Sequence, residues 1–157
     1  MNFQSTWSKP LDLIDGSRDG LTYTLANEDY KKLPNGPGAY VFARIHSERI
    51  VPLYIGETAN IHLRITQHFK TNVKLMNGIK KAPKGKKVVI FCAINTKSES
   101  KRSSMLSLLQ KALIEHSLAE GHVLLNMQLT KTPVHTISFK GNRYSEQIAP
   151  RTMYVQV

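Results

Sequence analysis

Two tyrosines on neighbouring predicted strands and an arginine–histidine pair on one predicted helix face are the residues whose types and spacing could do chemistry. Tyr40 and Tyr54 lie in two apolar runs separated by the polar stretch 46–49, and this pattern predicts a β-hairpin with the tyrosines on neighbouring strands. A glycine two residues from each tyrosine lets another backbone or a ligand approach closely. Arg64 and His68 are four residues apart in a predicted helix and therefore share one face. Arg64 and His68 can therefore converge on one ligand; for the tyrosines the alternative is that both are half-buried sheet residues.

Two helices are predicted around these residues. The first follows the hairpin and is marked by apolar residues at four-residue spacing, Ile61, Ile65 and Phe69, with Thr58 as its expected N-cap. The second covers 103–116 and has a serine cap, good helix formers and a glycine as its stop. Both helices are long enough to cover a face of a sheet.

The remaining segments are predicted to be mostly strands. Apolar or alternating runs over 21–25, 87–94, 134–139 and 153–157 read as strands, and the lysine-rich segment before 87 is expected to hold a short helix and a loop. Together these elements predict a single α/β domain, a small mostly antiparallel β-sheet of three central strands flanked by helices.

In their order along the chain, these residues resemble the GIY-YIG nuclease family. Gly38-Ala39-Tyr40 and Tyr54-Ile55-Gly56 correspond to the two motifs that name the family, and Arg64 and His68 follow in register. The match is close over residues 36–70 and continues more loosely to the C-terminal side. The resemblance implies a divalent-metal-dependent DNA endonuclease that hydrolyses phosphodiester bonds.

The resemblance also implies roles for the four side chains. Tyr40 is the expected general base, and Tyr54 is expected to hydrogen-bond a phosphate oxygen or the attacking water. Arg64 is expected to contact the scissile phosphate, because its fixed charge and planar fork suit an oxyanion. For His68 four roles stay open: it positions water, competes with Tyr40 as base, binds phosphate, or is a structural histidine.

Two further residues fit the spacing of the family's helix motif. Glu115 is expected to hold one Mg²⁺ (or Mn²⁺), with water and substrate oxygens completing the octahedron. Asn126 is expected to support the site by hydrogen bonding rather than to take part in the chemistry. The structural alternative for Glu115 is an exposed ion pair with Lys111, four residues earlier.

Two positions depart from the family pattern. Ala43 stands where a lysine is common, and the neighbouring Arg44 would point to the opposite face of the strand. Glu57, directly after the second motif, is expected to repel DNA, to pair with Arg64 or to assist metal binding. Both departures bear on catalytic rate more than on fold.

The net charge of +11 is concentrated in one segment. Residues 70–102 hold ten of the 22 basic residues and a single acid, Glu99. Such clustering favours a polyanion such as DNA, since each lysine near a phosphate releases condensed counterions. The alternatives are a solvated loop and an acidic membrane surface, and no apolar helical face supports the second. The residues expected to bind nucleic acid are Arg44, Lys70, Lys74, Lys80, Lys81, Lys84, Lys86 and Lys87.

Composition limits the remaining possibilities. With 157 residues, 41% hydrophobic and 21% charged, the chain fits one globular domain. We expect residues 1–35 to be an N-terminal extension packed on the core, 36–128 to be the GIY-YIG-like core, and 129–157 to add strands of the same domain. A lone buried cysteine makes an internal disulfide impossible and a zinc site improbable, and no small-molecule cofactor is expected.

Location and assembly are less well determined by the sequence. No apolar run approaches the ~20 residues of a membrane span, and no signal peptide is recognised at the first residues, so we expect a cytoplasmic protein without a membrane partner. The oligomeric state is not predicted. Two further functions compete with the nuclease: a catalytically weak or inactive nucleic-acid-binding module of the same fold, and a basic RNA- or ribosome-associated protein.

Overall fold

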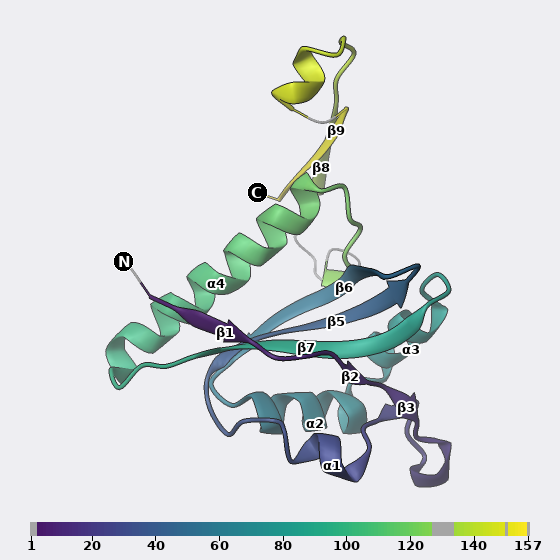
Figure 1. Cartoon of the computed structure of the whole chain (residues 1–157), viewed down its shortest axis with the longest axis vertical. Coiled ribbons are helices and arrows are strands. Elements are labelled where there is room, and N and C mark those ends of the chain that lie inside the picture. Colours follow the sequence, from purple (N-terminus) through teal and green to yellow (C-terminus); the bar gives the residue numbers. More distant parts are fainter. Residues whose placement is uncertain (1–2, 127–133, 150, 157) are drawn as a thin grey trace.

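The computed structural model describes residues 3–126, 134–149 and 151–156, and its centre is an antiparallel sheet. Strand β5 (Gly38–His46) lies between β6 (Arg49–Thr58) and β7 (Lys86–Ile94) (Figure 1). The predicted hairpin is confirmed: β5 and β6 pair through a tight turn at Ser47 and Glu48, both with positive φ. Two consecutive residues with positive φ match the twist of a two-residue hairpin.

Short strands from the N-terminal region complete this sheet. The strands β1 (Ser5–Trp7) and β2 (Leu11–Asp12) both pair antiparallel with β7, on the side away from β5. A separate small ribbon joins β3 (Ile14–Asp15) to β4 (Tyr23–Thr24), with the 3-10 helix η1 (Ser17–Asp19) between them. The strand predicted over 21–25 is thus present over two residues, while β1 and β2 were not predicted.

Helices cover both faces of the sheet. Below the sheet in Figure 1 lie α1 (Asn27–Tyr30), α2 (Ile61–Thr71) and α3 (Val73–Lys81), and above it lies the long α4 (Glu99–Ala119). Helix α2 begins after Asn60, whose side chain accepts the backbone N–H of Leu63, so the predicted N-cap Thr58 is wrong by two residues. Helix α4 begins one turn before the predicted residue 103.

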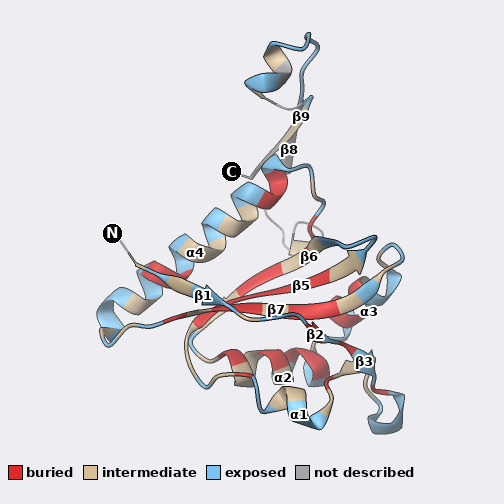
Figure 2. Cartoon of the chain, viewed as in Figure 1, coloured by how far each residue is buried: buried red, intermediate tan, exposed pale blue. Residues whose placement is uncertain are grey.

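The sheet separates two apolar layers. Because side chains alternate along a strand, Tyr40 and Phe42 of β5 face α2, where they pack with Ile61 and Ile65. Val41 on the same strand faces α4 and belongs to a smaller cluster that includes Ile55, Leu118 and Leu124. Figure 2 shows buried residues along the central strands and on the sheet-facing side of α2.

The two C-terminal strands form a hairpin of their own. The strands β8 (Val134–Ser138) and β9 (Thr152–Gln156) pair antiparallel with each other, and the 3-10 helix η2 (Ser145–Gln147) lies in the connection. The hairpin stands at the end of α4 (Figure 1) and does not extend the central sheet. In the part of the chain that the structure describes, no helix is both long and apolar enough to cross a membrane.

Candidate functional site

The centre of the candidate site is a buried hydrogen bond between Tyr40 of β5 and His68 of α2. The Tyr40 Oη and His68 Nε2 atoms are 2.6 Å apart, and the two side chains are only 1% and 2% exposed. Their ring centroids lie 5.4 Å apart. A phenol and an imidazole buried this deeply need each other as partners, since an unpaired buried polar group is costly.

Gly56 provides the space for the Tyr40 ring. It pairs with Tyr40 across the β5–β6 ladder, and a Cβ at this position would overlap the Tyr40 hydroxyl. Gly38, two residues before Tyr40, is equally confined, because a Cβ there would overlap the carbonyl oxygen of Cys92 on β7. Both glycines therefore serve close approach, as the sequence predicts.

Tyr54 and Arg64 complete a polar cluster with the buried pair. The Tyr54 ring centroid lies 6.3 Å from that of Tyr40 and 5.8 Å from that of His68. Arg64 stands one turn before His68 on α2, half-buried, and donates from Nη1 to Oε1 of Gln67 at 2.9 Å. The structure thus brings together Tyr40, Tyr54, Arg64 and His68, the four residues singled out first from the sequence.

Burial is the main cause of the pKa shifts of Tyr40 and His68. It raises the pKa of Tyr40, an effect that Tyr54 reinforces and that the charge of nearby Arg64 opposes without cancelling it. Burial, helped by the charge of Arg64, lowers the pKa of His68 to about 4. At pH 7 the free protein therefore holds Tyr40 as a neutral phenol and His68 as a neutral imidazole. The general base predicted at Tyr40 is protonated in this state.

Glu115 is not brought to the cluster. It lies on α4, which covers the opposite face of the sheet from α2, and its side chain is 66% exposed. Its Oε1 atom lies 3.8 Å from Nζ of Lys111, which is the ion pair that the sequence offered as the structural alternative. One carboxylate is still enough for a Mg²⁺ ion whose other ligands are water and phosphate, so the metal role of Glu115 stays a prediction.

Asn126 is hydrogen-bonded to the backbone of Ile55 on β6. Its Nδ2 donates to the Ile55 carbonyl oxygen at 2.7 Å and its Oδ1 accepts the Ile55 N–H at 2.8 Å. Gln110 of α4 donates to the same carbonyl at 3.2 Å, a contact that the sequence gave no reason to expect. Because Ile55 lies between Tyr54 and Gly56, these amides fix the strand segment that carries both.

Ala43 and Glu57, which depart from the family pattern, lie on the face of the sheet that α4 covers. Glu57 pairs with Ala39 in the ladder and alternates with Gly56, so it points to the α4 side, away from Tyr40. The structure shows no ion pair between Glu57 and Arg64. Arg44 is held by the loop before β7, where its Nη1 donates to the Lys84 carbonyl oxygen at 2.9 Å. Its guanidinium is therefore engaged within the fold.

The predicted nucleic-acid-binding lysines fall into two groups. Lys87 donates to the carbonyl oxygens of Ala82 and Pro83 at 3.2 and 2.7 Å, and Lys86 pairs with Asp12 at 3.3 Å. These two stabilise the fold, at least in part. The other five are exposed and form no ion pair with any residue that the structure describes: Lys70, Lys74, Lys80, Lys81 and Lys84.

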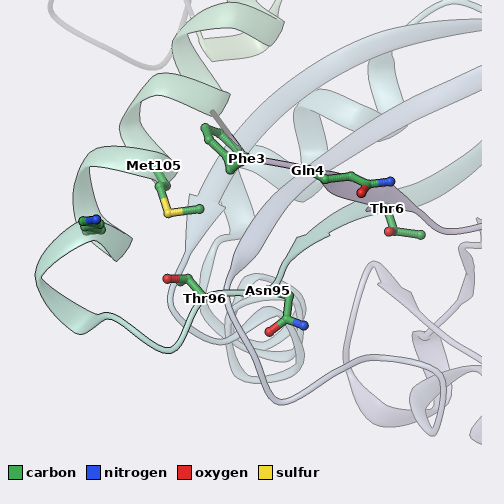
Figure 3. A pocket seen from close by; sticks show the side chains of 7 residues that line it. Phe3, Gln4, Thr6, Asn95, Thr96 and Met105 are labelled. Atoms are coloured by element: carbon green, nitrogen blue, oxygen red, sulfur yellow. The ribbon is translucent and has the colours of Figure 1, made fainter. Parts of the chain in front are cut away.

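The predicted site residues, all of them described by the structure, lie neither in a cluster of possible metal ligands nor in the pocket near the N-terminal end of the chain. Among the described residues, no group of three or more histidine, cysteine or acidic side chains is close enough to hold a metal ion. A pocket of about 780 Å³ lies between the N-terminal end of the chain and the start of α4, where Gln4, Asn95, Thr96 and Met105 line it (Figure 3). It contains none of the predicted site residues.

Asn72, which contacts this cluster, was not predicted from the sequence. Asn72, between α2 and α3, contacts His68 through its side chain, with Nδ2 3.0 Å from His68 Nδ1. Its four-residue spacing from His68 was the available signal. Comparisons of the chain with known protein families, with curated proteins and with solved structures found no match.

Proposed function

We propose that this protein is a divalent-metal-dependent DNA endonuclease of the GIY-YIG type, which hydrolyses phosphodiester bonds at the cluster of Tyr40, Tyr54, Arg64 and His68. The observation that carries the proposal is that these four polar side chains lie next to one another, with Gly56 providing the space for the Tyr40 ring. An apolar core would pack the same volume without polar groups that need partners.

The side chains that border the buried pair suit an oxyanion. Arg64 is half-buried and permanently charged, and a guanidinium close to a phosphate stabilises the charge that develops during hydrolysis. The Tyr54 hydroxyl, also half-buried, can donate to a second oxygen. A Mg²⁺ or Mn²⁺ ion bound to the phosphate would neutralise negative charge on the phosphate and the leaving oxygen. Glu115 is the carboxylate that the family resemblance suggests as its ligand, although it lies on the opposite face of the sheet from this cluster.

The distribution of lysines supports DNA as the substrate. Helices α2 and α3 carry Lys70, Lys74, Lys80 and Lys81, and both helices lie on the face of the sheet that holds Arg64. Exposed ammonium groups on that side would track the phosphates that flank the scissile one.

Two observations favour a second function, a nucleic-acid-binding module without catalysis. Glu115 stands on the far face of the sheet, and the buried Tyr40 is protonated at neutral pH. A module of this kind would keep Arg64 and the lysines as phosphate contacts and would need neither metal nor base.

Cleavage assays distinguish the two functions. The protein is incubated with supercoiled, linear, branched and single-stranded DNA and with RNA, each with and without Mg²⁺ or Mn²⁺. The endonuclease predicts metal-dependent DNA cleavage that is lost in Arg64→Ala and Glu115→Gln. Arg18→Ala, an exposed arginine of η1, is the charge-matched control and should cleave normally. DNA binding without cleavage in every condition would establish the binding module instead, and tight RNA binding that Arg64→Ala leaves unchanged would favour an RNA-associated protein.

A further inference from the structure

The side-chain amide of Asn72 joins a helix start to the buried pair. Its Oδ1 accepts the backbone N–H of Leu75 at 3.1 Å, which caps the N-terminus of α3. On its other side Nδ2 lies 3.0 Å from Nδ1 of His68. The same imidazole contacts the Tyr40 hydroxyl through Nε2 at 2.6 Å.

The cap determines which way the amide faces. A backbone N–H can only donate, so the atom of Asn72 that faces Leu75 must be the oxygen. The NH₂ group then faces His68 and can only donate, so Nδ1 of a neutral His68 must accept with its lone pair. A neutral imidazole carries one proton, which therefore sits on Nε2.

The direction of the next hydrogen bond follows from that proton. Nε2–H of His68 donates to the Tyr40 oxygen, so the Tyr40 proton must point away from His68, toward the side where Tyr54 and Arg64 lie. Arg64 has no acceptor atom. The Tyr40 proton is therefore available to the oxygen of Tyr54 or to an acceptor on a ligand.

We propose that Asn72 is a positioning residue that holds the His68 proton on Nε2, so that the hydrogen bonds run from Asn72 through His68 to Tyr40 and present donors to an oxyanion beside Arg64. The tautomer itself does not depend on the proposed nuclease function, but its consequence for phosphate binding rests on that function. In this arrangement His68 cannot receive the Tyr40 proton. It strengthens the Tyr40 hydroxyl as a donor instead, because hydrogen bonds in a chain polarise one another.

Two substitutions at one position separate the tautomer from the cap. Asn72→Asp keeps an oxygen for the Leu75 N–H but replaces the NH₂ group with an acceptor, which requires a proton on Nδ1 of His68. Asn72→Ser also keeps the N-cap, yet its short side chain does not reach His68, so it is the control for stability. Both variants should therefore fold.

The readout is the ¹⁵N spectrum of histidine-labelled full-length protein at pH 7, in which protonated and unprotonated ring nitrogens resonate far apart. We expect the proton on Nε2 in the wild type and on Nδ1, or on both nitrogens, in Asn72→Asp. A wild-type proton on Nδ1, or the same tautomer in Asn72→Asp as in the wild type, overturns the proposal.

Activity provides a second measurement. With the proton of His68 on Nδ1 in Asn72→Asp, the Tyr40 hydroxyl would donate to Nε2 of His68 and no longer to the oxyanion. Losing that hydrogen bond, of about 1.4 kcal/mol, should lower the rate of plasmid cleavage in Asn72→Asp about tenfold relative to Asn72→Ser. Equal rates in the two variants would contradict the consequence for the site. If the wild type shows the expected tautomer but cleaves no DNA, the proposed function fails and the inference about Asn72 stands.

Discussion

The two faces of the central sheet differ in how densely their side chains are packed. On the α2 face, Tyr40 and His68 are almost completely buried within a layer of apolar side chains. On the α4 face a cavity of about 310 Å³ remains between helix and sheet, with almost purely apolar walls that include Trp7, Ile50 and Leu113.

This difference in packing density shows which side chains the fold holds in one position. The cluster that resembles a nuclease site is fixed by dense packing, whereas the predicted metal ligand Glu115 stands exposed on the helix above the cavity. Close packing leaves few alternative positions for a side chain. The orientation of Tyr40 is therefore determined by the fold, and that of Glu115 by solvent and Lys111.

Truncation of one apolar side chain on each face tests the comparison most strongly. Ile65→Ala on α2 removes a fully buried side chain and should lower the free energy of unfolding by about 2–5 kcal/mol. Leu113→Ala on α4 enlarges an existing cavity that is open to solvent, and should cost less than about 2 kcal/mol. Urea unfolding measures both, and equal losses would show that the faces are packed alike.

The pH dependence of stability depends on the buried histidine. Since the folded-state pKa of His68 is about 4 and the ordinary value is 6.5, the unfolded chain binds more protons between these values. Stability is therefore complete above pH 6.5 and falls on acidification at up to about 1.4 kcal/mol per pH unit, until pH 4. His68→Gln should remove this slope, while His116→Gln, exposed on α4, should retain it. A slope unchanged in His68→Gln would place the titrating group elsewhere.

A methyl group added at Gly56, which pairs with Tyr40 in the β5–β6 ladder, tests how tightly the side chains on the α2 face are packed. Gly56→Ala puts a Cβ against the Tyr40 hydroxyl, so we expect a loss of about 1–3 kcal/mol in unfolding free energy. The matched control is Gly36→Ala, where a Cβ would meet no atom within 4 Å and φ is not positive. If both variants are equally stable, Tyr40 has room to move and the site is less rigid than its packing indicates.

Replacing the exposed Lys74, Lys80 and Lys81 of α3 with glutamine should have the smallest effect, changing the free energy of unfolding by no more than about 0.5 kcal/mol. The same replacement should weaken binding to all duplex DNA alike. For each lysine that neutralises a phosphate, its replacement should reduce the slope of log affinity against log salt by about 0.9. The control replaces lysines of and beside α4, namely Lys97, Lys101 and Lys111. Equal changes in slope would show that DNA does not distinguish the two sides of the molecule.

Much of the fold follows from local pattern. The hairpin 38–58 is predicted because two apolar runs flank a short polar stretch, and helix α2 because apolar residues recur at four-residue spacing. The N-cap was misplaced because Thr58 and Asn60 are both good caps, and only the structure shows that Asn60 accepts the Leu63 N–H. Strands β1 and β2 are too short to carry a pattern, and they form because β7 offers them an edge.

The candidate site was predicted less completely than the fold. Local spacing placed Tyr40 and Tyr54 on neighbouring strands and Arg64 and His68 on one helix face, and the family resemblance joined the four into one site. The sequence could not show that burial raises the pKa of Tyr40 in spite of the nearby charge of Arg64, because desolvation depends on everything packed around the side chain. For the same reason it could not show on which face of the sheet Glu115 would lie.

The amide contacts at Ile55 have a consequence for association between copies of the chain. Strand β6 is the outer strand of the sheet, and an open strand edge is a template for pairing with another chain. At Ile55 the side chains of Asn126 and Gln110 take up the backbone groups that an incoming strand would need. At this one residue the two side-chain amides make the hydrogen bonds that a neighbouring strand would otherwise make. A second molecule could pair with β6 at Ile55 only by displacing them, so this point of the edge, next to Tyr54, is protected against edge-to-edge pairing.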